Sequence, residues 1–124
     1  MRHTTIMLTL VGALLSAGPV PAHETAGKNG GRTTDAGKYH VELIAKDKTV
    51  EVYVLDGSEQ PVPASGFKGR ATLIADGKAA RVALAPADDS NKLTGTAEVS
   101  LPANPKGAVQ LTTPDGTSAS GKFN

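Results

Sequence analysis

The chain has 124 residues, with 13 lysines and arginines against 12 aspartates and glutamates, and it contains no cysteine. This length fits one small domain, and the near-neutral charge excludes the basic footprint that binding to nucleic acid or anionic lipid requires. The absence of cysteine excludes disulfides and thiolate metal ligands.

Residues 1–22 have the pattern of a cleavable secretory signal. A short basic start precedes an apolar run over residues 6–17, and the small residues Val20 and Ala22 stand at the −3 and −1 positions of a cleavage site. The apolar run is shorter than the ~20 residues that a membrane-spanning helix needs. We therefore expect cleavage after Ala22, export from the cytoplasm, a mature N-terminus at His23 and no membrane insertion of the mature chain.

Removal of this signal peptide leaves 102 residues with twelve basic and twelve acidic side chains. Both methionines, Met1 and Met7, leave with it, so the mature chain has no thioether ligand for copper(I).

Residues 23–36 are mostly polar or glycine and cannot bury enough surface to offset their ordering entropy, so we expect a flexible N-terminal arm. An alternation of period two then predicts half-buried strands over residues 38–46 and 49–55, joined by a tight turn at Asp47. In the first strand, Tyr39, Val41, Leu43 and Ala45 share the apolar face, and His40, Glu42 and Lys46 share the polar face.

The rest of the chain reads as further strands separated by turn signals. Proline and glycine predict a long loop over residues 56–69. Asp-Gly pairs at Asp76-Gly77 and Asp115-Gly116 are strong hairpin signals, because a type I′ turn needs two residues of positive φ. The remaining expected strands cover residues 71–75, 79–84, 92–101, 107–113 and 117–123.

No apolar pattern of helical period runs long enough for a helix. About seven short strands predict an all-β domain over residues 37–124, an antiparallel immunoglobulin-like β-sandwich that follows the signal peptide and the arm. A small barrel is the alternative architecture, and we expect a monomer.

Sequence motifs give no support for catalysis. The chain lacks the nucleophile elbow, the P-loop, the H-E-x-x-H helix motif and the C-x-x-C pair. We therefore expect that the protein is not an enzyme.

Metal binding is suggested by the mature N-terminus. A terminal His23 offers its α-amine and a ring nitrogen to one divalent ion, and copper(II) suits such a chelate, with nickel or zinc as alternatives. His40 could add a nitrogen, and Glu24 or Glu42 an oxygen. The opposing interpretation is that His23 begins the mature chain by accident of the cleavage position and that His40 is an ordinary surface residue.

Four stretches of the chain resemble a group of small periplasmic proteins associated with heavy-metal efflux systems. They are also similar to a segment of the periplasmic adaptor subunits of metal-exporting pumps of the resistance-nodulation-division class. The similar stretches lie between Asn29 and Leu93: Asn29-Gly30-Gly31-Arg32 with residues 37–46, Val50-Glu51-Val52-Tyr53-Val54-Leu55-Asp56 with Pro61-Val62, Gly69-Arg70-Ala71-Thr72, and Leu84-Ala85-Pro86-Ala87 with Asn91-Lys92-Leu93.

This resemblance implies a periplasmic β-sandwich that acts near metal export, and His40 matches the tyrosine-histidine step of the pattern. Two positions depart from it. Asn29 stands where a histidine often precedes Gly-Gly, and Gly57 stands where a histidine often follows the strand-end aspartate. These departures exclude a site with many histidines.

Two functions remain open at this stage. The first is an accessory protein of metal homeostasis that binds a divalent ion weakly through His23. The second is a metal-free module that docks on an envelope or efflux partner through a sheet edge or the loop over residues 56–69. Phe67 in that loop is either an exposed docking residue or a plug over one end of the sandwich, and we favour the plug.

Overall fold

The computed structural model describes residues 24–87 and 90–124, and this part of the chain is all-β without a helix. The strands and their bounds are β1 (Thr25–Ala26), β2 (Arg32–Ala36), β3 (Tyr39–Lys46), β4 (Thr49–Leu55), β5 (Lys68–Ala75), β6 (Lys78–Pro86), β7 (Lys92–Thr96), β8 (Gly107–Thr112) and β9 (Ser118–Phe123). The predicted signal peptide, residues 1–22, and His23 lie outside the described residues.

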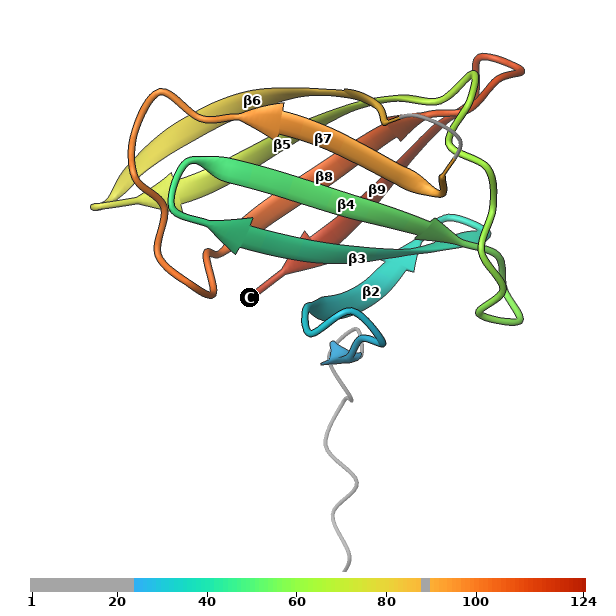
Figure 1. Cartoon of the computed structure of the whole chain (residues 1–124), viewed down its shortest axis with the longest axis horizontal. Helices are drawn as coiled ribbons and strands as arrows, with labels where there is room; N and C mark the ends of the chain where they lie inside the picture. The colour runs from blue at the N-terminus through green and yellow to red at the C-terminus, as the bar shows by residue number, and fades with distance from the viewer. Residues whose placement is uncertain (1–23, 88–89) are drawn as a thin grey trace, which may run out of the picture.

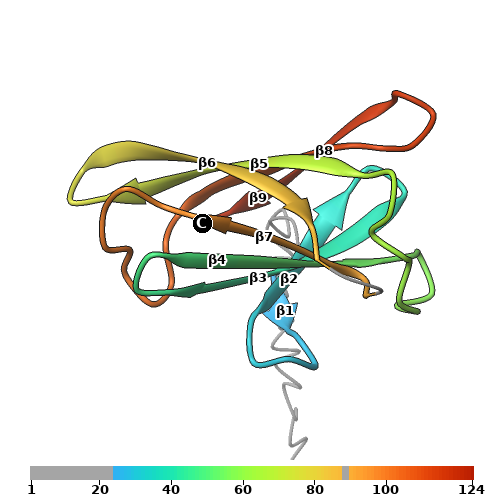
Figure 2. The ribbon, with the colours of Figure 1, turned by 45° about the horizontal axis from the view of Figure 1, so that its top comes forward.

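The nine strands form one antiparallel sheet in the order β1-β2-β3-β4-β7-β6-β5-β8-β9 (Figure 1). Strand β7 lies between β4 and β6, but only the pairs Ala85–Thr94 and Pro86–Leu93 join it to β6. The sheet curls at this short junction, so that β1, β2, β3, β4 and β7 form one half and β6, β5, β8 and β9 the other. The two halves face each other, and β2 contacts β9 across the interior (Figure 2).

The period-two alternation places the apolar residues between the two halves, as the sequence predicts. Val50, Val52 and Val54 of β4 have no exposed surface, and Leu73 of β5 and Leu111 of β8 on the other half belong to the same buried cluster. Aliphatic side chains fill most of this core, with the aromatic ring of Phe123 fully buried among them.

Phe67 is a buried plug rather than an exposed docking residue. Its side chain is 3% exposed, and its ring meets that of Tyr39 edge-on with the centroids 5.4 Å apart. An edge-to-face pair of this kind adds to the stabilisation from burial. The loop before β5 is therefore fixed to the core through Phe67.

Both predicted Asp-Gly hairpins are present. Asp76 and Gly77 have φ of 50° and 75°, the two positive values that a type I′ turn requires, between β5 and β6. In the second hairpin, a hydrogen bond from Thr113 N to Thr117 O closes a turn that is one residue longer and contains Pro114, Asp115 and Gly116. Gly116 has φ of 88°. These residues fix the register of both hairpins.

The carboxylate of Asp115 stabilises the second hairpin. A hydrogen bond from the hydroxyl of Thr113, joined by one from the backbone N–H of Thr117, lowers the pKa of Asp115 from 3.8 to about 2. Because the folded-state pKa is depressed, this stabilisation is fully present above pH 3.8 and is lost as the pH falls towards about 2. We expect an NMR titration of the Asp115 carboxyl to show this low midpoint, and Thr113→Val to move the midpoint back towards 3.8. An unchanged midpoint in Thr113→Val would contradict this role of the hydroxyl.

The expectation of a flexible arm over residues 23–36 is wrong for its described part. Residues 32–36 form β2, which pairs with β3 from Arg32–Leu43 to Ala36–Tyr39, and Thr34 is 1% exposed. The ladder with β3 and the contact with β9 supply the burial that the composition of the segment does not suggest. The domain therefore begins before residue 37.

One strand is shorter than expected. The prediction for residues 92–101 holds only to Thr96, because β7 pairs with β4 and β4 begins at Thr49, the partner of Thr96. The following residues form a loop held by hydrogen bonds from Ala97 N to Lys48 O and from Leu101 N to Asp47 O.

Candidate functional site

Glu42 is a buried anchor for the N-terminal turn. Its side chain lies on the polar face of β3, as predicted, but it is only 1% exposed because residues 27–31 fold over it. Its carboxylate accepts hydrogen bonds from the backbone N–H of Asn29 at 2.9 Å, from the backbone N–H of Gly31 at 2.8 Å and from the Asn29 side chain at 3.0 Å. Gly27 lies so close to the Glu42 carboxylate that a β-carbon there would overlap it.

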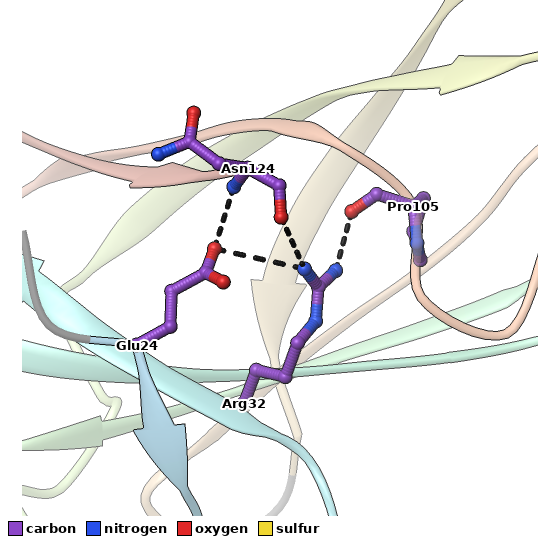
Figure 3. A network of polar contacts seen from close by, with 4 residues as sticks. All are labelled: Glu24, Arg32, Pro105 and Asn124. Atoms are coloured by element: carbon purple, nitrogen blue, oxygen red, sulfur yellow. Dashed lines mark hydrogen bonds and ion pairs between the residues drawn. The ribbon is translucent and has the colours of Figure 1, made fainter. Parts of the chain in front are cut away.

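Glu24 belongs to a second cluster, drawn in Figure 3, that ties the N-terminal segment to β9. Its Oε1 accepts the backbone N–H of Asn124 at 2.5 Å and lies 3.6 Å from Nη1 of Arg32. The Arg32 guanidinium also donates to the carbonyl oxygens of Pro105 and Asn124 and stacks over the Phe123 ring at 5.2 Å. This network holds the two ends of the domain together.

His40 belongs to a third cluster at the other end of β2. Its Nε2 lies 3.1 Å from Oδ1 of Asp35, the residue directly opposite it on β2. Its Nδ1 lies 3.9 Å from Oε1 of Glu59 in the loop after β4. The imidazole is 24% exposed, and both carboxylates are more open to solvent.

The four residues proposed as metal ligands do not form one site among the described residues. Glu24, Glu42 and His40 lie in three separate clusters, and each has its own partners within the protein. No group of three or more histidine or acidic side chains in residues 24–87 and 90–124 is arranged to hold a metal ion. The position of His23 lies outside the described residues.

The strands of the two halves differ in the charges that they carry. Strands β5, β6, β8 and β9 contain five charged residues, and all are basic: Lys68, Arg70, Lys78, Arg81 and Lys122. Strands β2, β3, β4 and β7 instead contain three acidic residues, Asp35, Glu42 and Glu51, beside Arg32, Lys46 and Lys92. The near-neutral net charge of the whole chain therefore conceals a difference in charge between the strands of the two halves.

Four of these cations share the outer face of their half. Lys68, Arg70, Arg81 and Lys122 are exposed and alternate along their strands with buried core residues. The ladders place Arg81 and Lys122 in one row across the sheet, through Thr72 and Ala108. We call the outer surface of β5, β6, β8 and β9 the basic face. Its other members are small or uncharged: Thr72, Ile74, Ala79, Ala83, Ala85, Ala108, Gln110, Thr112, Ser118 and Ser120.

The basic face is hollowed at one end. Lys68, Arg70, Gln110 and Thr112 line a shallow open hollow beside Pro86 at the end of β6. Among the described residues, its lining contains two cations, an amide and a hydroxyl, and no acidic side chain. The hollow can therefore receive anionic groups and offer them hydrogen bonds.

The four cations have no partner of opposite charge within the described residues. Ion pairs there involve Arg32, His40 and Lys92, all on the other half. On that half, for example, Lys92 lies 3.8 Å from Glu51 and offsets its charge. No ion pair among the described residues thus offsets the charge of the basic face.

Comparisons with protein-family models, with curated proteins and with solved structures found no match to this chain. Within the described segments, no helix has the length and apolar character needed to span a membrane.

The basic face was missed at the sequence level because net charge averages over the whole chain. A signal was nevertheless present. The strands predicted between residues 71 and 123 contain Arg81 and Lys122 but hardly any acidic residue, and Lys68 and Arg70 directly precede them in alternate positions. Assigning each of these side chains to the outer face would have located the surface.

Proposed function

We propose that the protein is a non-catalytic docking module of the periplasm that binds an envelope or efflux partner through its basic face. The observation that carries this proposal is the clustering of basic residues on the strands of one half. All charged residues of β5, β6, β8 and β9 are basic, and four of them lie on one exposed face. A surface of one sign attracts partners of the opposite sign and raises the rate of encounter.

Location and fold class complete the proposal. The signal-peptide pattern of residues 1–22 supports export, and the resemblance over residues 29–93 supports a periplasmic role near metal efflux. The two facing halves support a sandwich of immunoglobulin-like type. The strand order counts against the usual immunoglobulin topology. In that topology the second strand of the chain lies between the first and the fifth. Here β3, the second strand after the two-residue β1, lies between β2 and β4. We propose a monomer, since docking through this face needs no second copy.

Weak binding of a divalent ion is the second candidate function. The specific observation in its favour is the solvent-accessible grouping of Asp35, His40 and Glu59. The two carboxylates face different nitrogens of the imidazole, so one ion could use His40 with only one of them. His23 offers a separate chelate at a mature N-terminus.

Calorimetric titration of the mature protein with copper(II), nickel(II) and zinc(II) tests the metal candidate. One-to-one binding that is lost in His23→Ala would support the terminal chelate, and loss in His40→Ala would support the Asp35 pair. If neither substitution changes the affinity, both proposed sites are wrong.

Site-specific photo-crosslinking in the producing cell tests the docking function. A photoreactive side chain at Thr72, in the middle of the basic face, should give a discrete crosslinked product with an envelope protein. The same group at Thr49 of β4, an exposed residue of the other half, is the matched control and should give none. Equal products from both positions, or none from Thr72, would contradict docking through the basic face.

A further inference from the structure

We infer that the hollow at the end of the basic face binds an extended acidic segment of a partner protein, with two of its carboxylates on Lys68 and Arg70. This inference rests on the proposed docking function and adds the chemistry of the partner.

Strand geometry provides the first argument. Lys68 and Arg70 are two residues apart on the same face of β5, a separation of about 7 Å along the strand. An extended peptide places its alternate side chains on one side with the same spacing of about 7 Å. A segment with acidic residues at alternate positions, lying along β5, would therefore bring one carboxylate to each cation.

The lining of the hollow provides the second argument. Gln110 lies beside Arg70 in the β5–β8 ladder, and Thr112 lies beside Lys68. Each cation thus has an uncharged hydrogen-bonding neighbour, and this pairing suits a carboxylate or a peptide group. Arginine can hold a carboxylate through two parallel hydrogen bonds, which fixes orientation as well as charge.

The lack of exposed apolar side chains near the hollow favours a protein segment over a membrane surface. Interfacial membrane binders combine basic residues with large apolar side chains that enter the bilayer. The large apolar side chain exposed on the basic face is Ile74, and it lies at the opposite end of β5 from Lys68. Phe67 and Leu84 border the hollow but are buried in the core. Around the hollow the face therefore lacks the apolar anchor that a bilayer would require.

Fluorescence anisotropy with a defined probe tests this inference. The probe is a labelled peptide of about eight residues that alternates glutamate and threonine, long enough to span one strand of the face. We expect saturable binding to the mature protein that weakens between about 20 mM and about 300 mM salt, because added ions screen exposed charge pairs. A peptide of the same length that alternates glutamine and threonine should not bind.

Charge reversal locates the binding site. Lys68→Glu with Arg70→Glu should lower the affinity for the acidic peptide by about tenfold or more, and replacement of both residues by glutamine should lower it less. Lys46→Glu with Lys48→Glu makes the same change in net charge on the other half and should leave the affinity within about twofold. A matching loss in this control, or no binding by the unmodified protein, would overturn the inference.

A second arm uses vesicles that contain an anionic phospholipid. Binding to these vesicles without binding to the acidic peptide would replace the protein segment by a membrane surface and overturn the inference.

The crosslinking at Thr72 distinguishes a failure of the acidic-segment inference from a failure of the docking function. If crosslinking succeeds and the peptide does not bind, the acidic segment is wrong but docking stands. If crosslinking also fails, the docking function falls.

Discussion

Gly95→Ala is expected to lower the free energy of unfolding by about 3 kcal/mol or more. A β-carbon at Gly95 would lie 2.2 Å from the carbonyl oxygen of Ala83 and 2.7 Å from a methyl group of Val82. Neither neighbour can withdraw easily, because β6 meets β7 just beyond this point and the pair joins the two halves of the sheet. Chemical denaturation followed by circular dichroism measures the loss.

Gly57→Ala is the matched control for this substitution. A β-carbon at Gly57 would lie 3.7 Å from the carbonyl oxygen of Lys38, which is ordinary van der Waals contact. We expect a change within about 0.5 kcal/mol. Equal stability of Gly95→Ala and Gly57→Ala would show that β6 and β7 do not meet in the way described.

Glu42→Ala is expected to cost about 3 kcal/mol, the second large effect. The substitution removes the carboxylate that accepts three hydrogen bonds from Asn29 and Gly31, and it leaves those donors without a partner under the turn. Hydrogen bonds to a charged acceptor are stronger than neutral ones, so their loss is correspondingly large. Denaturation measures the global effect, and amide hydrogen exchange at Asn29 and Gly31 should accelerate most.

Glu51→Ala on the neighbouring strand is the control for Glu42→Ala. Glu51 is partly exposed and lies 3.8 Å from Lys92, so its removal should cost less than about 1 kcal/mol. If Glu42→Ala is no more costly than Glu51→Ala, the turn over residues 27–31 does not depend on the buried carboxylate.

Much of the strand pattern could be predicted from the sequence, because it depends on local alternation. Val50, Val52 and Val54 identify β4 and its buried face, and the Asp76-Gly77 pair identifies the β5–β6 hairpin. The register of that hairpin follows from the short turn.

The N-terminal region could not be predicted in the same way. In the sequence, Glu42 is one of the polar residues that alternate along an exposed strand face. Its burial depends on residues 27–31, which contact it only after folding, and the order of β2 depends on pairing with β3 and packing against β9. Such contacts between distant segments cannot be inferred from composition alone.

The candidate site was also hidden for a physical reason. The residue types of Glu24, Glu42 and His40 suit metal binding, but the fold places the three in separate clusters with partners of their own. The basic face instead arises from the side of the sheet on which ordinary lysines and arginines project. Recognition of that face required strand parity together with the ladders that bring Arg81 and Lys122 into one row.

Mapping of the surface by NMR is the most direct test of docking through the basic face. Isotope-labelled protein comprising residues 23–124 would be titrated with the acidic peptide while the backbone amide signals are followed. We expect shifts concentrated at Lys68, Arg70, Gln110 and Thr112, with little change around His40. Shifts concentrated around Asp35 and His40, or spread evenly over both halves, would contradict a binding surface on β5, β6, β8 and β9.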